Sequence, residues 1–447
     1  MNPVCVFLRV YNDADHLSPV IWKFLDEGHP VEVILLDKNL TLDYDTDPRL
    51  GLLRKFPACR MVYYYATVPG LGFLKKFSLA RFRNPFIKKI ANIFLNFLKR
   101  FVLKRGWAEQ LIASRRPLAC VFDSCEMSPD TLEGRLAVAC KKFHVPLVCL
   151  PHGMHYITSY GSASEQLKRL GDEEYFSFRD TFDVIVEPNP LHHFGPWDQK
   201  LIERKKIVFL GSARYCPEWF SMARNFWPDF KAAKSDAGKF KLLFFLPRWE
   251  KTVDKEGVLE ALGALASDSG VYLAVKEHTR EGAGTMPHDL RMKLANAGNV
   301  ELVSGSTTLS LKQWLASQRM SRSAYPVVDS VALVRWCDAA INIRSSVGLE
   351  VILQNKVLFN PVYLCSDKTI FDRDGAGIEC GSLQELLAAV QKCRVSKGDP
   401  RAFYDSSFLI KNSVYAGQGP HDVLSTYTRL IQSFDKGAFP ERNYAEK

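Results

Sequence analysis

A histidine follows a short apolar run near the end of the first third of the chain. The run Pro146–Leu150 predicts a buried strand, and His152 and Gly153 come directly after it. Ligands of open α/β sheets bind beyond the carboxyl ends of the strands. An imidazole there can act as a general base or donate a hydrogen bond to a phosphate. A histidine that only completes a loop is the alternative.

Basic side chains follow a second apolar run, Val271–Val275. Lys276 and His278 share one face for as long as the strand continues, because side chains repeat every two residues, and Arg280 can join them. Lys, His and Arg gathered at the end of a strand form a site for a phosphate or diphosphate. A charged loop in contact with water is the alternative.

Two serines follow a third apolar run, Ala339–Ile343, and are predicted to open a helix that runs to Leu353. The free N–H groups and partial positive charge of a helix start bind phosphate. Glu350 lies one turn into this helix, where a carboxylate can hold ribose hydroxyls. The alternative is an ordinary serine cap, but Glu350 lies four residues beyond Ser346, not the three residues that separate the members of a capping box. The other serine is Ser345.

Short strands that alternate with helices must position these groups. Val4–Val10, Leu17–Asp26 and Val31–Leu36 predict a strand, a helix and a strand, which favours a parallel sheet. The strands are continuous apolar runs, as expected when helices cover both faces. Beyond the runs already named, the predicted strands are Ala119–Phe122, Val184–Val186, Ile207–Leu210, Leu242–Leu246, Val300–Val303 and Val357–Asn360.

A chain of 447 residues allows two or three domains. The polar and aromatic stretch Cys216–Lys239 predicts the boundary between a first α/β domain, 1–215, and a second, 240–405, followed by a helical tail, 406–447. No P-loop, no G-x-G-x-x-G after the first strand, no H-E-x-x-H, no G-x-S-x-G and no kinase motif set occurs. Those absences argue against the corresponding nucleotide-binding, metalloprotease, hydrolase and kinase classes.

The order of the motifs resembles nucleotide-dependent transferases of the GT-B fold. The resemblance is to the CDP-glycerol glycerophosphotransferase family and to the CMP-sugar (sialyl, Kdo) transferases of bacterial surface polysaccharides. The matching segments, each placed at a strand end, are Pro151-His152-Gly153, the turn Gly211-Ser212-Ala213-Arg214, Leu246-Pro247-Arg248-Trp249, Lys276-x-His278 and Ser345-Ser346. The resemblance implies two Rossmann-like domains facing a cleft, with the donor nucleotide on the second and the acceptor on the first. It also implies that Arg248 lies on the donor side and that no metal or other cofactor is bound.

Carboxylates follow two predicted strands of the first domain. In a GT-B protein, the loops after these strands face the cleft near the acceptor. A transfer to a hydroxyl group needs a carboxylate or histidine near the attacking oxygen. Together with His152, the candidates are Asp13, Asp15 and the neighbouring His16 after the first strand, and Asp123 and Glu126 after Ala119–Phe122. The sequence does not choose among them, and a helix cap is the alternative for Asp13 or Asp15.

The positive charge of the chain is concentrated in one segment. There are 59 Lys and Arg against 49 Asp and Glu, and residues 75–105 hold ten Lys and Arg with no acid. On a helical wheel the apolar side chains fall on one side and the cations on the other, a pattern typical of an interfacial helix on anionic lipid. A core helix of the first domain with a solvated face is the alternative. A charge excess confined to one segment is unlike a nucleic-acid-binding surface, so no nucleic acid is expected as a partner.

The eleven cysteines include no C-x-x-C pair, which favours a reducing compartment over a disulfide framework or zinc site. The first residues show no secretory signal, and no apolar run of about 18 residues occurs. We therefore expect a cytoplasmic protein, peripheral on the inner face of the cell membrane.

The sequence as a whole predicts a GT-B glycosyltransferase. It would move a sugar or polyol-phosphate unit from a nucleotide-activated donor, CMP- or CDP-linked by resemblance, to a lipid-linked surface glycan such as lipopolysaccharide or capsule. The alternatives are an enzyme like the UDP-sugar 2-epimerases, which share the fold, and a catalytically inactive GT-B-like scaffold that binds membrane and partner enzymes.

Overall fold

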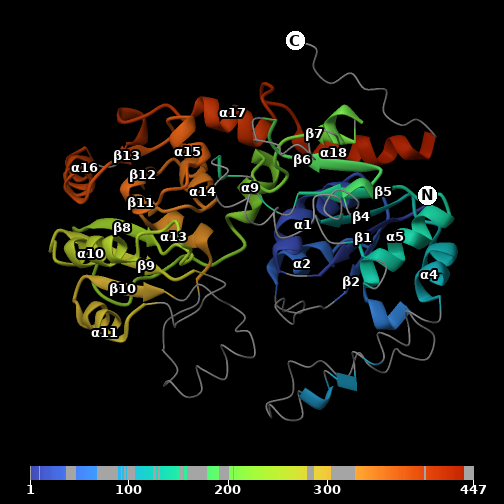
Figure 1. Ribbon diagram of the computed structural model, residues 1–447, viewed down its shortest axis with the longest axis horizontal. Helices are drawn as coiled ribbons and strands as arrows, with labels where there is room; N and C mark the ends of the chain where they lie inside the picture. Colours follow the sequence, from blue (N-terminus) through green and yellow to red (C-terminus); the bar gives the residue numbers. More distant parts are fainter. Residues whose placement is uncertain are drawn as a thin grey trace.

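The protein folds into two parallel sheets, each covered by helices on both faces, which lie side by side (Figure 1). The computed structural model describes residues 2–9, 11–36, 47–67, 89–91, 93, 94, 97, 106–123, 127, 128, 131–151, 153, 156–158, 179–190, 201–204, 206–278, 286–303, 328–396 and 399–436. None of the helices in these ranges is long and apolar enough to cross a membrane.

The first sheet has seven strands in the order β3-β2-β1-β4-β5-β6-β7. The strands are β1 (Val4–Leu8), β2 (Val31–Leu35), β3 (Cys59–Tyr63), β4 (Ala119–Asp123), β5 (Leu147–Leu150), β6 (Val184–Glu187) and β7 (Ile207–Phe209). Helices α1 (Tyr11–Asp26) and α2 (Pro48–Leu53) pack on one face, and α4 (Trp107–Arg115) and α5 (Leu132–Lys142) pack on the other. A 3-10 turn, Tyr64–Thr67, follows β3.

The second sheet has six strands in the order β10-β9-β8-β11-β12-β13. They are β8 (Phe240–Phe245), β9 (Val271–Lys276), β10 (Val300–Val303), β11 (Ala339–Asn342), β12 (Val357–Pro361) and β13 (Ile378–Cys380). One face carries α10 (Lys255–Ala266), α11 (His288–Asn296) and α16 (Leu383–Val395), and the other carries α13 (Ser330–Trp336), α14 (Gly348–Leu353) and α15 (Ile370–Arg373). Short 3-10 turns cover Val362–Leu364 and Pro400–Ala402.

Every predicted strand is present, with ends that move by no more than two residues. The helix expected to begin at Leu17 begins at Tyr11 instead. Strands β3 and β13 were not predicted. Both are edge strands, only partly buried, so their sequences lack the continuous apolar run that marks a strand covered on both sides.

Three chain segments connect the two halves. Helix α9 (Pro217–Ala223) follows β7, with Trp219 packed in the first domain's core and Phe220 in the second's. The tail crosses back: α17 (Ser407–Tyr415) packs on the second domain and α18 (Val423–Gln432) packs on α1, with a final 3-10 turn at Ser433–Lys436 (Figure 1). The loop after β5 also reaches the second domain, where the N–H of Thr158 donates to the carbonyl of Lys368 at 2.8 Å.

Candidate active site

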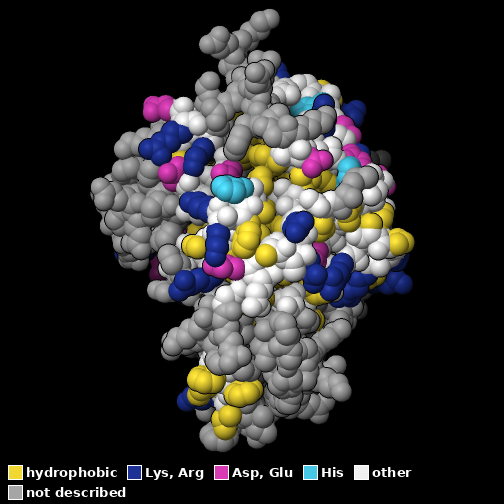
Figure 2. All heavy atoms as spheres, turned by 90° about the vertical axis from the view of Figure 1, so that its right-hand side faces the viewer, with side chains coloured by type: hydrophobic (Ala, Val, Ile, Leu, Met, Phe, Trp, Pro, Cys, Tyr) yellow, Lys and Arg dark blue, Asp and Glu magenta, His cyan; other side chains and the backbone are white. Residues whose placement is uncertain are grey.

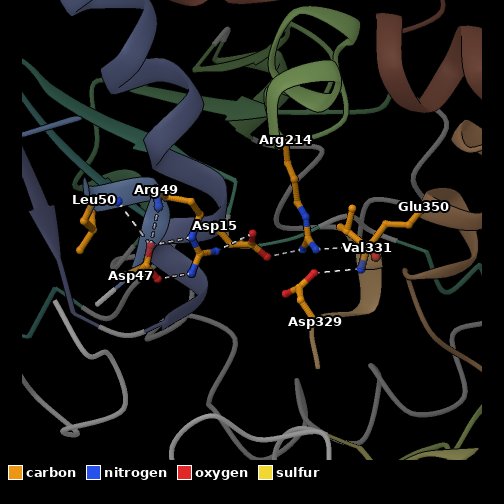
Figure 3. Close-up of polar contacts among 8 residues, drawn as sticks. All are labelled: Asp15, Asp47, Arg49, Leu50, Arg214, Asp329, Val331 and Glu350. Carbon is orange, nitrogen blue, oxygen red and sulfur yellow. Dashed lines mark hydrogen bonds and ion pairs between the residues drawn. The ribbon is translucent and has the colours of Figure 1, made fainter. Parts of the chain in front are cut away.

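Arg214 joins a carboxylate of the first domain to a carboxylate of the second. Its Nη1 lies 2.6 Å from Oδ2 of Asp15 on α1, and its Nη2 lies 2.5 Å from Oε1 of Glu350 on α14 (Figure 3). Burial by itself lowers the pKa of Arg214, but the negative charges around it, Asp15 first, outweigh burial and raise that pKa above its usual value. The guanidinium therefore stays charged at the junction of the two domains.

The C-terminal tail holds the turn that carries Arg214. Gly211 has a φ of 85°, and a Cβ there would lie 2.2 Å from the carbonyl oxygen of Val414, so only glycine fits. The N–H of Ser212 donates to that same carbonyl at 3.0 Å, and the buried hydroxyl of Tyr427 donates to the carbonyl of Gly211 at 2.6 Å. The position of Arg214 thus depends on residues about 200 positions further along the chain.

Asp15 is oriented by a second arginine. Arg49 on α2 donates from Nη1 to Oδ1 of Asp15 at 2.7 Å, and its Nη2 lies 2.6 Å from Oδ2 of Asp47. Asp47 also caps α2, because its carboxylate accepts from the N–H groups of Arg49 and Leu50 (Figure 3). Burial raises the pKa of Asp15, but the charges of Arg214 and Arg49 outweigh burial and lower it, so Asp15 is ionised.

Glu350 is almost fully buried at the start of α14, with 1% of its surface exposed. Gly348 allows α14 to approach β11 and α15 closely, since a Cβ there would lie 2.7 Å from the ring of Phe371. Burial is the largest effect on Glu350 and raises its pKa to about 7, although the charge of Arg214 opposes the rise. This carboxyl group can therefore gain or lose a proton near neutral pH.

Two more ionisable groups of the second domain belong to the same cluster. Asp329 caps α13 by accepting from the N–H of Val331 at 2.8 Å, and burial raises its pKa. Lys276 ends β9 with 7% of its surface exposed. Burial lowers the pKa of Lys276, and the charges of Asp329 and Glu350 only partly offset that effect. We call Asp15, Arg49, Arg214, Lys276, Asp329 and Glu350 the cleft cluster.

A small hollow with a cavity volume of about 30 Å³ lies against this cluster. Its charged lining comes from Asp15, Arg49, Arg214, Asp329 and Glu350, and its aromatic lining from Trp219, Phe220, Phe226 and Trp227. The lining thus combines ionisable groups with aromatic rings, and the volume is close to that of one water molecule.

The double serine lies in the turn before α14. The helix begins at Gly348 with Val347 as its cap residue, so Ser345 and Ser346 precede the helix instead of opening it. Just before them, Arg344 has a left-handed φ of 49°, a conformation that costs about 1–3 kcal/mol for a residue other than glycine. Ion pairs of Arg344 with Glu250 and Asp367 hold this turn.

Four other predicted site residues are not members of the cleft cluster: Arg248, Asp13, Asp123 and His278. Arg248 is half exposed and its Nη1 lies 3.3 Å from Glu250, in the ion-pair group around Arg344. Asp13 is buried and accepts from the N–H of Arg9 at 2.5 Å, which ties the start of α1 to the end of β1. Asp123 is also buried and pairs with the side chain of Arg9. His278 is half buried two residues beyond the end of β9.

His152, Glu126 and Arg280 lie outside the described residues. Gly153 is described, and a Cβ at that position would lie 3.9 Å from Nε2 of His16 on α1. Gly153 therefore lies next to α1, beside the residue that follows Asp15 in the sequence.

Sequence reasoning brought Lys276, Asp15 and Glu350 forward separately but assigned no role to Arg49, Arg214 or Asp329. The sequence did contain a signal for Arg214, the Gly211-to-Arg214 turn at the end of the first domain. Neither Asp329 nor Arg49 follows an apolar run in the sequence. Their membership of the cleft cluster therefore emerges only from the contacts described above. In the described part of the chain, no group of three or more His, Cys, Asp or Glu is placed to hold a metal ion.

Solved structures share this architecture over the full chain. S. aureus MnaA, in a co-structure with UDP, has a TM-score of 0.55 and 13% identity, with 100% of both chains covered. A putative UDP-N-acetylglucosamine 2-epimerase from Listeria monocytogenes has a TM-score of 0.56 and 11% identity, with 99% of each chain covered. The UDP-GlcNAc 2-epimerase from Neisseria meningitidis, bound to UDP-GlcNAc, has a TM-score of 0.54 and 10% identity, over 97% of this chain and 100% of its own.

These likenesses define the class of architecture. No model of a protein family and no curated protein matches the chain. At such low sequence identity the structural likeness concerns the fold alone. The fold is GT-B, with two Rossmann-like domains facing a cleft, and the predicted fold class is confirmed.

The raised pKa of Glu350 gives a pH-dependent stability. Its pKa is about 7 in the folded protein against an ordinary 4.5. The native state therefore holds more protons than the unfolded chain between these values, and the stability linked to Glu350 is present below pH 4.5 and lost as pH rises through 7. We expect Glu350→Gln to gain stability relative to wild type by about 3 kcal/mol between acid pH and pH 8. Urea midpoints across this range measure the difference. The exposed Glu379→Gln is the control, and an equal pH dependence in both variants would contradict the prediction.

Proposed function

We propose that this protein is a nucleotide-sugar-dependent glycosyltransferase that works in the cleft between its two domains. The observation that carries the proposal is Arg214, which is held between Asp15 of the first domain and Glu350 of the second. The GT-B fold, and the UDP or UDP-GlcNAc named with two of the similar structures, support a nucleotide-activated donor. The order of the sequence motifs supports a CMP- or CDP-linked donor.

On the donor side, Arg214 and Lys276 supply cations for the phosphates of the donor. A guanidinium can bind two phosphate oxygens at once, and a lysine adds a point charge. His278 after β9, and Ser345 and Ser346 after β11, add hydrogen-bond donors on either side of β8. In this proposal the Glu350 carboxylate accepts hydrogen bonds from the ribose hydroxyls.

On the acceptor side, Asp15 and His152 are the proposed catalytic groups. The acceptor hydroxyl attacks the anomeric carbon of the donor sugar, its proton passes to Asp15 or His152, and the bond from that carbon to the phosphate oxygen breaks. The nucleotide leaves with the electron pair, and Arg214 and Lys276 stabilise the charge on its phosphate. The proposed acceptor is a growing surface glycan linked to lipid, reached from the cytoplasmic side of the membrane.

An epimerase is the second candidate. It is favoured by the full-length likeness to the UDP-GlcNAc 2-epimerase from Neisseria meningitidis and to the putative one from Listeria monocytogenes. Carboxylates that meet Arg214 from both domains also favour it. Product analysis with CMP-, CDP- and UDP-activated sugars, with and without a glycan acceptor, separates the possibilities. Transfer requires the acceptor, whereas an epimerase inverts the sugar at carbon 2 without one. Nucleotide binding with no product in any mixture would indicate an inactive scaffold.

The donor side can be tested by binding alone. We expect His278→Ala and Ser346→Ala each to weaken nucleotide binding by about 10- to 150-fold, since a contact to a charged phosphate contributes about 1.5–3 kcal/mol. Arg214→Ala should weaken it at least as much. Thermal shifts with CMP, CDP, UDP and GDP identify the preferred nucleotide and measure the loss. Matched controls are His421→Ala and Ser267→Ala on the surface. Unchanged affinity in the three site variants would remove the donor-site assignment.

A further inference from the structure

An apolar helix face of the first domain is exposed to solvent. Residues 89–91, 93, 94 and 97 are helical, and within them Ile90, Ile93, Phe94 and Phe97 are 53%, 62%, 50% and 65% exposed. A spacing of three, four and seven residues places these side chains on one face of a helix. In a globular protein such a face normally packs against the core. Here it is turned outward, so these residues do not behave as part of a core helix.

This exposure is concentrated at one place. Of the exposed large hydrophobic side chains in the described ranges, four lie within residues 90–97, and the other five are scattered over the rest of the molecule: Val138, Phe143, Met292, Val395 and Phe408. Isolated apolar side chains on a surface are ordinary, whereas a contiguous group marks an interaction site. Figure 2 shows a group of hydrophobic side chains at the lower end of the molecule, and Figure 1 shows the helical turns near residue 90 away from both sheets.

The residues on either side of the stretch 68–105 contact each other. The segment leaves the edge strand β3 through the turn Tyr64–Thr67 and returns at α4. The indole Nε1 of Trp107, the first residue of α4, donates to Oγ1 of Thr67 at 2.7 Å, and the rings of Tyr64 and Trp107 meet edge to face at 6.0 Å. Because entry and exit lie together, a partner can bind the segment without disturbing the strand order of the sheet.

We propose that Ile90, Ile93, Phe94 and Phe97 form a docking surface for an anionic lipid bilayer. In the sequence, these four residues lie within the stretch 75–105, which holds ten Lys and Arg and no acid. A bilayer with anionic headgroups offers hydrocarbon to the apolar face and negative charge to the cations. A second copy of this chain would bring the same cations against each other, and a nucleic acid would leave the apolar face in water. The proposal does not depend on the enzyme activity proposed above.

Vesicle sedimentation tests the surface directly. We expect wild type to bind vesicles that contain phosphatidylglycerol at low salt, and to bind phosphatidylcholine vesicles much more weakly. The double variant Phe94→Gln and Phe97→Gln should lower the partition coefficient by about tenfold or more, because two aromatic side chains no longer enter the interface. Phe408→Gln, at an equally exposed site on α17, is the matched control and should bind like wild type.

The cations provide a second, independent variant. Changing Lys88, Lys89, Lys99 and Arg100 to Gln should weaken binding by about fivefold per cation at low salt, and added salt should weaken wild type in the same direction. Circular dichroism and urea midpoints check that both variants fold. Wild type that ignores anionic vesicles, or variants that bind as well as wild type, would overturn the proposal, as would a dimer in solution that either variant dissociates. Transfer activity on a soluble acceptor would survive such a failure, so the two proposals fail separately.

Discussion

Replacing Asp15 by Asn should lower turnover by about 10²–10⁴-fold, the usual contribution of a positioned general base. Arg214 and Arg49 lower the pKa of this carboxyl group, so it is ionised and able to accept a proton or a hydrogen bond from an acceptor hydroxyl. Asn keeps the size of the side chain but cannot take up the proton. The measurement is kcat at saturating donor and acceptor, with the nucleotide affinity determined separately.

Asp47→Asn is the matched control for Asp15→Asn. Asp47 also binds Arg49, but it lies on the far side of that guanidinium from Asp15, and Asn caps a helix about as well as Asp. The control should keep most of its turnover. If Asp15→Asn turns over as fast as wild type, Asp15 only orients Arg214, and the proton acceptor is His152 or Glu126.

His152→Ala should lower turnover by a similar factor, about 10²–10⁴-fold, with little change in donor binding. The physical reason is that residue 152 follows β5 directly in the sequence, and that the next residue, Gly153, lies beside His16 on α1. Added imidazole should restore part of the lost turnover, because a small base can occupy the space left by the side chain. The surface variant His421→Ala should behave as wild type.

The double variant of Asp15 and His152 shows how the two groups act. If they serve one proton transfer, the double variant is about as slow as the slower single variant, because groups that act as a unit are not additive. If the loss of turnover in the double variant equals the product of the two single losses, the two groups act in separate steps. Full turnover of His152→Ala would make the histidine structural and leave the carboxylates of the first domain as the catalytic candidates.

Most of the sheet framework follows from local sequence. A strand covered by helices on both faces must be largely apolar, and such an apolar run occurs in β1, β4, β5, β8, β9 and β11. The edge strands β3 and β13 have one partly solvated side, so local sequence does not distinguish them from loops. The basic segment was equally evident, because ten cations without an acid are a property of composition alone.

Local sequence also indicated which strand ends carry ionisable and polar side chains. Lys276, Ser345, Ser346 and Glu350 follow apolar runs, and parallel strands bring their carboxyl ends to one edge. The start of α14 was placed too early, because the left-handed Arg344 and the close packing of Gly348 delay the helix by two residues. Arg344 pairs with Glu250 and Asp367, and Gly348 packs against Phe371. These partners are distant in the sequence, so a local sequence pattern does not reveal them.

Only the tertiary structure decided that Arg214 joins Asp15 to Glu350. Arg214 and Glu350 are 136 residues apart, and their pairing depends on how the two domains face each other. The turn that carries Arg214 is itself held by Val414 and Tyr427 of the tail. Whether a charged side chain is a site or a solvated surface depends on its burial and on the charges that reach it through space. A sequence determines which groups can ionise, whereas the pKa of Glu350 and the charge state of Asp15 arise from neighbours that only folding assembles.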